Sequence, residues 1–256
     1  MDLQLKGKTA IVTGGTRGIG RSIAELFAQE GANVAVCARN AEQVQAFVAE
    51  LKGYGVEAYG EAVDIADGPA LTGFVQAAGE RLGGLDVLVS NASALVNGGS
   101  EADWRAMFEI DMLGAVRTFE AALPFLEQAA QQTGDAAFVI VSSVSAAETS
   151  GGSAYGPMKA ALIHYAKGLA RQHAAKKVRA NVVSPGTVLF EGGVWGNVRE
   201  QAPGFFEQMI KRNPTGRMAT PEEIAAAVVF LASPRSAFTT GSNLLVDGAI
   251  SSRVNF

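Results

Sequence analysis

Short apolar segments alternate with longer helical segments along almost the whole chain, and this alternation restricts the possible folds more than any other feature. The predicted strands are Thr9–Thr13, Asn33–Ala38, Glu57–Asp64, Asp86–Ser90, Ala136–Ser142, Arg179–Ser184 and Asn243–Asp247. Most of them are continuously apolar, which is typical of strands that helices cover on both faces. The pattern therefore predicts one α/β domain over residues 1–256, with seven strands in a doubly wound parallel sheet.

Composition excludes several classes of function. The 256 residues are 48% hydrophobic and carry a net charge of −4, which gives no electrostatic reason to expect a nucleic-acid or membrane partner. One cysteine excludes an internal disulfide, and two histidines leave little material for a metal site. The chain shows no signal peptide and no apolar stretch of about 20 residues, so we expect a cytoplasmic protein.

A glycine-rich loop follows the first predicted strand. In "VTGGTRGIGRS", Gly14, Gly18 and Gly20 precede a helix whose apolar stripe ends near Gly31. A loop without side chains lets backbone N–H groups and the positive end of a helix approach a pyrophosphate. A plain strand–helix turn would also use glycines, but the position after the first strand favours a Rossmann-like dinucleotide site.

The end of the second strand indicates which dinucleotide binds. An NAD site usually places an acidic side chain there, whereas this chain reads "VCARN" and has Arg39. An arginine can bind a 2′-phosphate through two hydrogen bonds, and Arg17 in the glycine-rich loop could add a second positive contact. The sequence therefore favours NADP(H) over NAD(H), unless both arginines are merely solvated.

Tyr155 and Lys159, in "YGPMK", lie four positions apart and would share one helix face. Free tyrosine ionises near pH 10, and an adjacent ammonium favours its phenolate, so the pair could transfer a proton to or from a carbonyl oxygen. A preceding strand end supplies two serines, of which Ser143 is preferred over Ser142 as the hydroxyl that holds the carbonyl. Alone, a Tyr–Lys pair at this spacing is common on exposed helices.

In this order and spacing, the motifs resemble those of the short-chain dehydrogenase/reductase family over about residues 6–250, in particular its 3-oxoacyl-carrier-protein-reductase-like branch. The matching pieces are "TGGTRGIG" (13–20), "VDI" (63–65), "LDVLVSNAS" (85–93), "VSSVS" (141–145), "YGPMK" (155–159), "NVVSPGTV" (181–188) and "GRMATPEEIAAAVVFLASPRSAFTTGSNLLVDGA" (216–249). The resemblance implies hydride transfer between a nicotinamide cofactor and a carbonyl or alcohol.

The resemblance also implies a role for individual residues. Tyr155 would be the general acid/base, Lys159 would tune it, Ser143 would hold the substrate carbonyl, and Asp111 would complete the catalytic set. Asp64 would contact the adenine, the Asn91–Ala92 backbone the adenine ribose, and Pro185–Val188 the nicotinamide. The cofactor-binding residues are then Gly14, Thr16, Arg17, Gly18, Ile19, Gly20, Arg39, Asp64, Ile65, Asn91, Ala92, Tyr155, Lys159, Pro185, Gly186 and Val188.

Three features depart from the family pattern. Ser90 and Ser93 flank Asn91–Ala92 where the family usually has Asn and Gly, and Phe190 replaces an expected threonine. Asp111 stands where the family commonly has asparagine. Since an ionised aspartate only accepts hydrogen bonds, a water relay through this site would be rewired and the rate would change.

The segment 186–219 interrupts the alternation and is predicted to be a substrate lid. Its apolar residues, Phe190, Trp195, Phe205, Phe206 and Met209, could wall a pocket, although packing within the lid is the preferred interpretation. The substrate stays open among 3-oxoacyl thioesters, cyclic or aromatic ketones, and polyols or sugars, the last with NAD. An idle dinucleotide-binding sensor or scaffold is the alternative from another class.

A helix capped by Thr220 and Pro221 is apolar nearly all round. Such a helix lies either at a subunit interface or in the interior of one chain. The family resemblance implies a homotetramer or homodimer.

Overall fold

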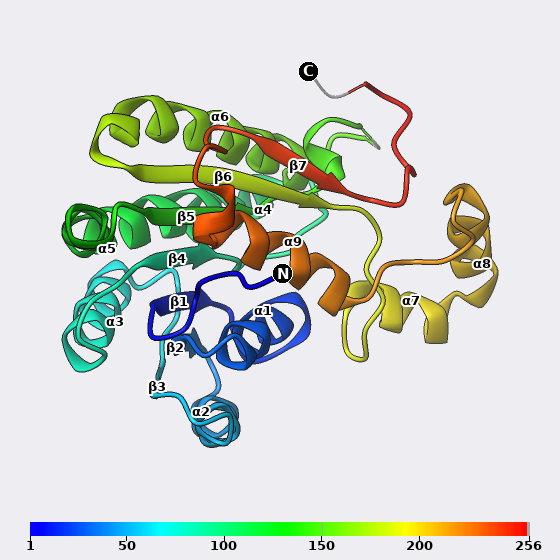
Figure 1. Cartoon of the computed structure of the whole chain (residues 1–256). Helices are drawn as coiled ribbons and strands as arrows, with labels where there is room; N and C mark the ends of the chain where they lie inside the picture. Colours follow the sequence, from blue (N-terminus) through cyan, green and yellow to red (C-terminus); the bar gives the residue numbers. More distant parts are fainter. Residues whose placement is uncertain (150, 255–256) are drawn as a thin grey trace.

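The computed structural model describes residues 1–149 and 151–254 of the chain. In this part, seven parallel strands form one sheet in the order β3-β2-β1-β4-β5-β6-β7 (Figure 1). The strands are β1 Thr9–Thr13, β2 Asn33–Ala38, β3 Ala58–Ala62, β4 Val87–Ser90, β5 Ala136–Val141, β6 Val178–Pro185 and β7 Asn243–Val246. The predicted fold class, a Rossmann-like doubly wound sheet, is confirmed, and the strand order reverses between β1 and β4.

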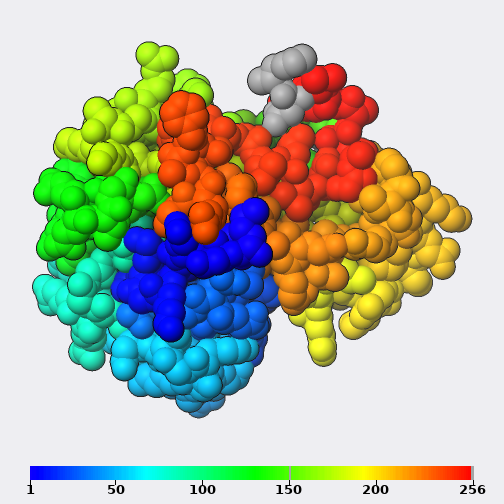
Figure 2. Space-filling view, in the orientation of Figure 1, coloured from blue at the N-terminus to red at the C-terminus, as the bar shows by residue number. Residues whose placement is uncertain are grey.

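Helices cover both faces of the sheet. They are α1 Gly18–Gln29, α2 Ala41–Lys52, α3 Gly68–Arg81, α4 Glu101–Met107, the π-helix η1 Phe108–Leu113, α5 Gly114–Thr133, α6 Tyr155–His173, α7 Val194–Gln201, α8 Pro203–Arg212 and α9 Pro221–Ala232, with short 3₁₀ turns η2 Val144–Ala146, η3 Ala174–Lys176 and η4 Pro234–Ser236. One buried cluster joins α1, α2 and α9 to the sheet, and a second joins α3, α5 and α6 to the other face. Helices α7 and α8 project from one end of the molecule (Figures 1 and 2).

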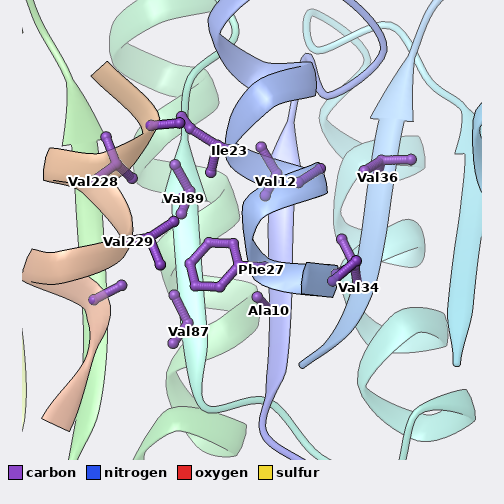
Figure 3. Close-up of a cluster of buried hydrophobic side chains, with 14 of the residues drawn as sticks. Ala10, Val12, Ile23, Phe27, Val34, Val36, Val87, Val89, Val228 and Val229 are labelled. Atoms are coloured by element: carbon purple, nitrogen blue, oxygen red, sulfur yellow. The ribbon is translucent and has the colours of Figure 1, made fainter. Parts of the chain in front are cut away.

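The first buried cluster is centred on α1. Phe27 is fully buried and lies against Val87, Val89 and Val229, which come from β4 and α9 (Figure 3). Complete burial of a phenylalanine side chain stabilises the fold by about 1.5–3 kcal/mol. This packing holds α1 against the sheet.

Strands β1 and β2 have the predicted bounds, whereas those of the other five strands differ by one or two residues. Two of these differences follow from pairing. Strand β3 ends at Ala62 rather than Asp64, because its only neighbour β2 ends at the partner residue Ala38. Strand β6 continues to Pro185, since Val246 of β7 still pairs with it. Asp64 is thereby released into the loop after β3.

The predicted helix ends are confirmed. Gly31 adopts φ +79° just beyond α1, and Thr220 forms a capping box with Glu223 at the start of α9. The apolar α9 packs against α1 and the sheet, so most of its burial comes from its own chain. Phe230 on α9 stays 38% exposed.

Within residues 1–149 and 151–254, none of the helices combines the length and apolarity that crossing a bilayer requires. The same residues contain no group of three or more His, Cys, Asp or Glu side chains arranged to hold a metal ion. Cys37 is buried in β2, and burial raises the pKa of its thiol to about 12.

Candidate active site

A cavity of about 770 Å³ opens where the carboxyl ends of β1, β4, β5 and β6 meet. Open α/β sheets bind ligands at this edge, beside the point where strand order reverses. Its lining combines the glycine-rich loop, the loops after β4 and β5, the first turn of α6, the segment from 185 to 212 and the C-terminal tail. The volume lies in the range of small-molecule and cofactor sites.

The glycine-rich loop is held in place by Asn91. The Asn91 side-chain amide donates to the carbonyl oxygens of Thr13 and Gly14, at 3.0 and 3.1 Å. The Thr13 hydroxyl in turn accepts from the backbone N–H of Asn91 and Ala92. A Cβ atom at Gly20 would collide with the Gly14 carbonyl, so this close approach requires glycine.

The same loop leaves the start of α1 open. Arg17 is the N-cap residue in extended conformation, and no side chain caps the helix. The first N–H groups of a helix have no intrahelical partners, and together with the helix dipole they attract an anion. The residues present therefore fit the pyrophosphate of a dinucleotide.

Tyr155 is the first residue of α6, and Lys159 follows one turn later. The Lys159 ammonium lies 5.6 Å from the centre of the Tyr155 ring and donates to the Val141 carbonyl at 3.2 Å. Burial disfavours the ammonium, but the charges of Asp111 and Tyr155 outweigh this, and the pKa of Lys159 is raised. Lys159 is thus a buried cation beside the phenol.

Asp111 lies behind Lys159, on the π-helix between α4 and α5. Its Oδ2 accepts from the Ala94 N–H at 2.9 Å, and its Oδ1 lies 2.9 Å from Lys159 Nζ. Oδ1 has no hydrogen-bond partner among the described residues, and its contact with the ammonium is an ion pair. Both side chains are almost completely buried, at 0% and 3% exposure.

The two serines after β5 have different partners. Ser142 donates its hydroxyl to the Lys159 carbonyl of α6 at 2.9 Å. The Ser143 hydroxyl accepts from the Ser145 N–H at 3.1 Å, which leaves its own hydrogen available for another acceptor. Both serines line the cavity beside Tyr155.

The segment 186–219 contains α7 and α8 and forms one wall of the cavity. Four of its predicted apolar residues line the wall: Phe190, Trp195, Phe205 and Met209. Trp195 stacks on Phe205 at 6.1 Å, and the Phe190 ring lies against Gly18. These four residues thus line the cavity, and Trp195 and Phe205 also pack on each other, whereas Phe206 is buried and outside the lining.

Most of the predicted site residues meet in the cavity. Its lining includes Gly14, Arg17, Ile19, Gly20, Asn91, Ala92, Ser143, Tyr155, Lys159, Pro185, Gly186 and Val188. Thr16, Gly18, Arg39, Asp64, Ile65 and Asp111 lie outside it. Arg39 and Asp64 follow β2 and β3 and are exposed at the same sheet edge. The roles assigned to these residues stay predictions.

Sequence reasoning missed several lining residues. Leu95 and Asn97 come from the loop after β4, and Ile250 comes from the C-terminal tail. No spacing pattern marks them, because only the folded chain brings them to this edge. Thr187, inside the quoted "SPGTV", has a buried hydroxyl with no partner among the described residues and faces the same cavity.

A family profile described as enoyl-(acyl carrier protein) reductase, of the short-chain alcohol dehydrogenase type, matches residues 14–251. Isoepoxydon dehydrogenase patN of Penicillium expansum is 38% identical over 96% of this chain and 95% of its own length. The chain belongs to the short-chain dehydrogenase/reductase family. It is an oxidoreductase of that family, and the predicted resemblance is confirmed.

Two further relatives illustrate the range of the family. The 3-oxoacyl-[acyl-carrier-protein] reductase FabG of Chlamydia pneumoniae is 31% identical over 98% of this chain and 99% of its own. The solved structure of L-sorbose reductase from Gluconobacter frateurii, complexed with NADPH and L-sorbose, superposes with a TM-score of 0.91. That protein is 29% identical, and the match covers 99% of this chain and 100% of that one.

Proposed function

We propose that the protein is an NADP(H)-dependent oxidoreductase that interconverts a ketone and a secondary alcohol. The observation that carries this proposal is a single cavity that joins an open glycine-rich loop to Ser143, Tyr155 and Lys159. One end of the cavity suits a dinucleotide phosphate, and the other presents a proton donor beside a buried cation. These are the two components that hydride transfer to a carbonyl requires from a protein.

The cofactor would lie along the carboxyl edge of the sheet. Asn91 and Thr13 hold the glycine-rich loop that faces the pyrophosphate, and Arg17 and Arg39 supply positive charge for a 2′-phosphate. When bound, the nicotinamide supplies or accepts the hydride. Solved relatives support NADP(H), including L-sorbose reductase, although a 7α-hydroxysteroid dehydrogenase holds NADH.

Three residues of this chain would perform the proton chemistry. Hydride addition builds negative charge on the carbonyl oxygen, and Tyr155 delivers the proton that neutralises it. Ser143 donates a hydrogen bond to the same oxygen. Its hydroxyl hydrogen is available for this, whereas the Ser142 hydroxyl donates to the Lys159 carbonyl. Lys159 supplies the positive field that stabilises the phenolate left behind.

The lid and the C-terminal tail would bind the body of the substrate. Trp195, Phe205, Met209 and Ile250 give the cavity a largely apolar wall. We therefore propose a ketone with a ring-shaped or apolar body. Polar lining by Asn97 favours polyols or sugars as the second candidate, and D-threitol dehydrogenase of Mycolicibacterium smegmatis is 34% identical.

We also propose that the chain forms a homodimer or homotetramer. Strand β7 is an edge of the sheet, and Leu244 on it is 37% exposed. Phe230 on α9 and the fully exposed Phe238 lie in the segment that leads to this strand. A second copy would cover these aromatic side chains and the open strand edge. Light scattering gives the molar mass of the unaltered protein and of Phe238→Asp in solution, and we expect the substitution to lower it. The proposal is refuted if the unaltered protein is a monomer.

The cytoplasmic location stays a prediction.

A substrate screen with NADPH and NADH in parallel tests the function. We expect turnover of ketones with NADPH, and a loss of roughly 10²-fold or more in Tyr155→Phe, because the general acid is removed. Tyr165→Phe is the matched control, since Tyr165 lies on the same helix outside the cavity lining. Arg39→Asp should raise the KM for NADPH more than that for NADH.

Other outcomes of the screen are equally informative. Turnover that survives Tyr155→Phe would refute the assigned acid. Tight NADPH binding without turnover of any ketone, polyol or sugar would instead favour the idle dinucleotide-binding sensor.

A further inference from the structure

Asp111 contacts Lys159 although it neither lines the cavity nor belongs to the glycine-rich loop. It is carried on η1, the π-helical turn that joins α4 to α5, and is 1% exposed. One carboxylate oxygen accepts the Ala94 N–H, and the other meets the Lys159 ammonium at 2.9 Å. The carboxylate is thus held from both sides and cannot turn away from Lys159 without losing the hydrogen bond from Ala94.

Two of the other acids near this pair form ion pairs of their own. The titratable groups on η1 and on the helices packed against it are Glu101, Asp103, Arg105, Glu109, Arg117, Glu120, Glu127, Tyr155, His164, Tyr165, Lys167, Arg171 and His173, and Glu148 lines the cavity. Glu101 pairs with Arg105 and Glu109 with Arg117, at 2.7 and 2.5 Å near the surface. The charges that act on Lys159 are those of Asp111 and Tyr155.

The geometry therefore sets one cation between two acids. A carboxylate at 2.9 Å from the ammonium, in a dry environment, cancels a large part of the positive field that would otherwise reach the phenol. The Tyr155 ring lies farther from the same ammonium, at 5.6 Å from its centre. Lys159 consequently favours the phenolate less than an uncompensated lysine at the same position would.

We propose that Asp111 is a positioning residue that weakens the action of Lys159 on Tyr155 and so biases the enzyme toward carbonyl reduction. This inference rests on the proposed function, in which Tyr155 gives a proton during reduction and, as phenolate, takes one during alcohol oxidation. With Asp111 present, Lys159 stabilises that phenolate less. Oxidation therefore needs more alkaline conditions, and reduction persists over a wider range.

Asp111→Asn tests the inference, because asparagine keeps an acceptor for the Ala94 N–H and removes the charge. The rate of oxidation should rise with pH, and the rate of reduction should fall. In Asp111→Asn we expect both changes to occur about one pH unit lower, which corresponds to a tenfold change in the ionisation equilibrium. Asp111→Ser is a second neutral variant and should shift the pH dependence of both rates in the same direction. Thermal unfolding of each variant checks that it is folded.

Glu109→Gln is the matched control, since it removes an acid from the same π-helix that is paired with Arg117 at the surface. Its pH profiles should superpose on those of the unaltered enzyme. The inference is overturned if the neutral Asp111 variants also leave the profiles in place, or if they move them to higher pH.

A second measurement does not depend on turnover. The chain has four tyrosines, so the near-ultraviolet phenolate signal of Tyr155 is obtained by subtracting the signal of Tyr155→Phe at each pH. In the Asp111→Asn background this signal should appear at lower pH than in the unaltered protein. If no substrate is turned over, the proposed function fails, while this titration still supports or refutes the role of Asp111.

Discussion

Separate substitutions of the two adjacent serines should damage different properties of the protein. Ser143→Ala removes a hydroxyl whose hydrogen is available to the substrate oxygen, so we expect kcat to fall by about 10²–10³-fold. Removal of one donor to a developing oxyanion costs about 3–4 kcal/mol of transition-state stabilisation. The stability of the fold should change little, because the lost hydroxyl accepts only a short-range bond from the Ser145 N–H.

Ser142→Ala should have the opposite effect. The Ser142 hydroxyl is buried, and its 2.9 Å bond to the Lys159 carbonyl joins β5 to α6. Loss of one such bond costs about 1 kcal/mol. For a chain of this size that corresponds to a fall in Tm of roughly 2–4 °C. We expect kcat to change less than about tenfold, since only a positioning contact is lost.

Steady-state kinetics and thermal unfolding of both variants check this pair of expectations. Ketone reduction with saturating NADPH gives kcat, and calorimetry or circular dichroism gives Tm. The reasoning is wrong if Ser142→Ala abolishes turnover at an unchanged Tm, or if Ser143→Ala remains fully active. Either result would make Ser142 the hydroxyl that holds the carbonyl.

Three further predictions concern groups away from the reacting atoms. Because burial raises the pKa of Cys37 to about 12, the native protein should resist thiol alkylation at mildly alkaline pH, and rapid labelling of the folded chain would contradict this. Arg179 is buried, forms two hydrogen bonds with Asp135 and donates to three carbonyls at the end of α9. Arg179→Met should therefore lower the free energy of unfolding, measured by urea titration, by about 3–5 kcal/mol. A loss below about 1 kcal/mol would refute the reasoning. Hydrogen bonds from Arg217 and the backbone lower the pKa of Glu223 from 4.5 to about 2, and a depressed carboxyl pKa stabilises the fold above the ordinary value. The stability difference between the unaltered protein and Glu223→Gln should therefore be complete at neutral pH and vanish as the pH falls from about 4.5 toward 2, and a constant difference would contradict it.

Local patterns were sufficient to predict much of the fold. Continuous apolar runs indicated most of the seven strands, since strands buried on both faces need apolar residues at every position. The end of β3 could not be predicted, because it depends on where its neighbour β2 stops at Ala38. The capped start of α9 at Thr220 and Pro221 was predicted correctly, since a helix cap is set by residues within one turn.

In the candidate site, too, some features follow from local sequence and others depend on tertiary packing. Tyr155 and Lys159 are one helical turn apart, so their spacing alone placed them together. The glycine-rich loop was equally visible, because its glycines adjoin the strand and the helix that it connects. The sequence left open whether Phe205 and Trp195 face a cavity or pack on each other, since this depends on packing between distant segments, and the structure shows both.

By itself, the sequence determined the order of strands and helices along the chain, the glycine-rich loop and the Tyr–Lys pair, because each is encoded within a few consecutive residues. Only the tertiary structure decided that Asp111 faces Lys159, that Ser142 is bonded to α6 and that Ile250 reaches the cavity. These contacts join residues far apart in the chain. Their geometry depends on how helices and loops pack around the sheet, and no local pattern records that packing.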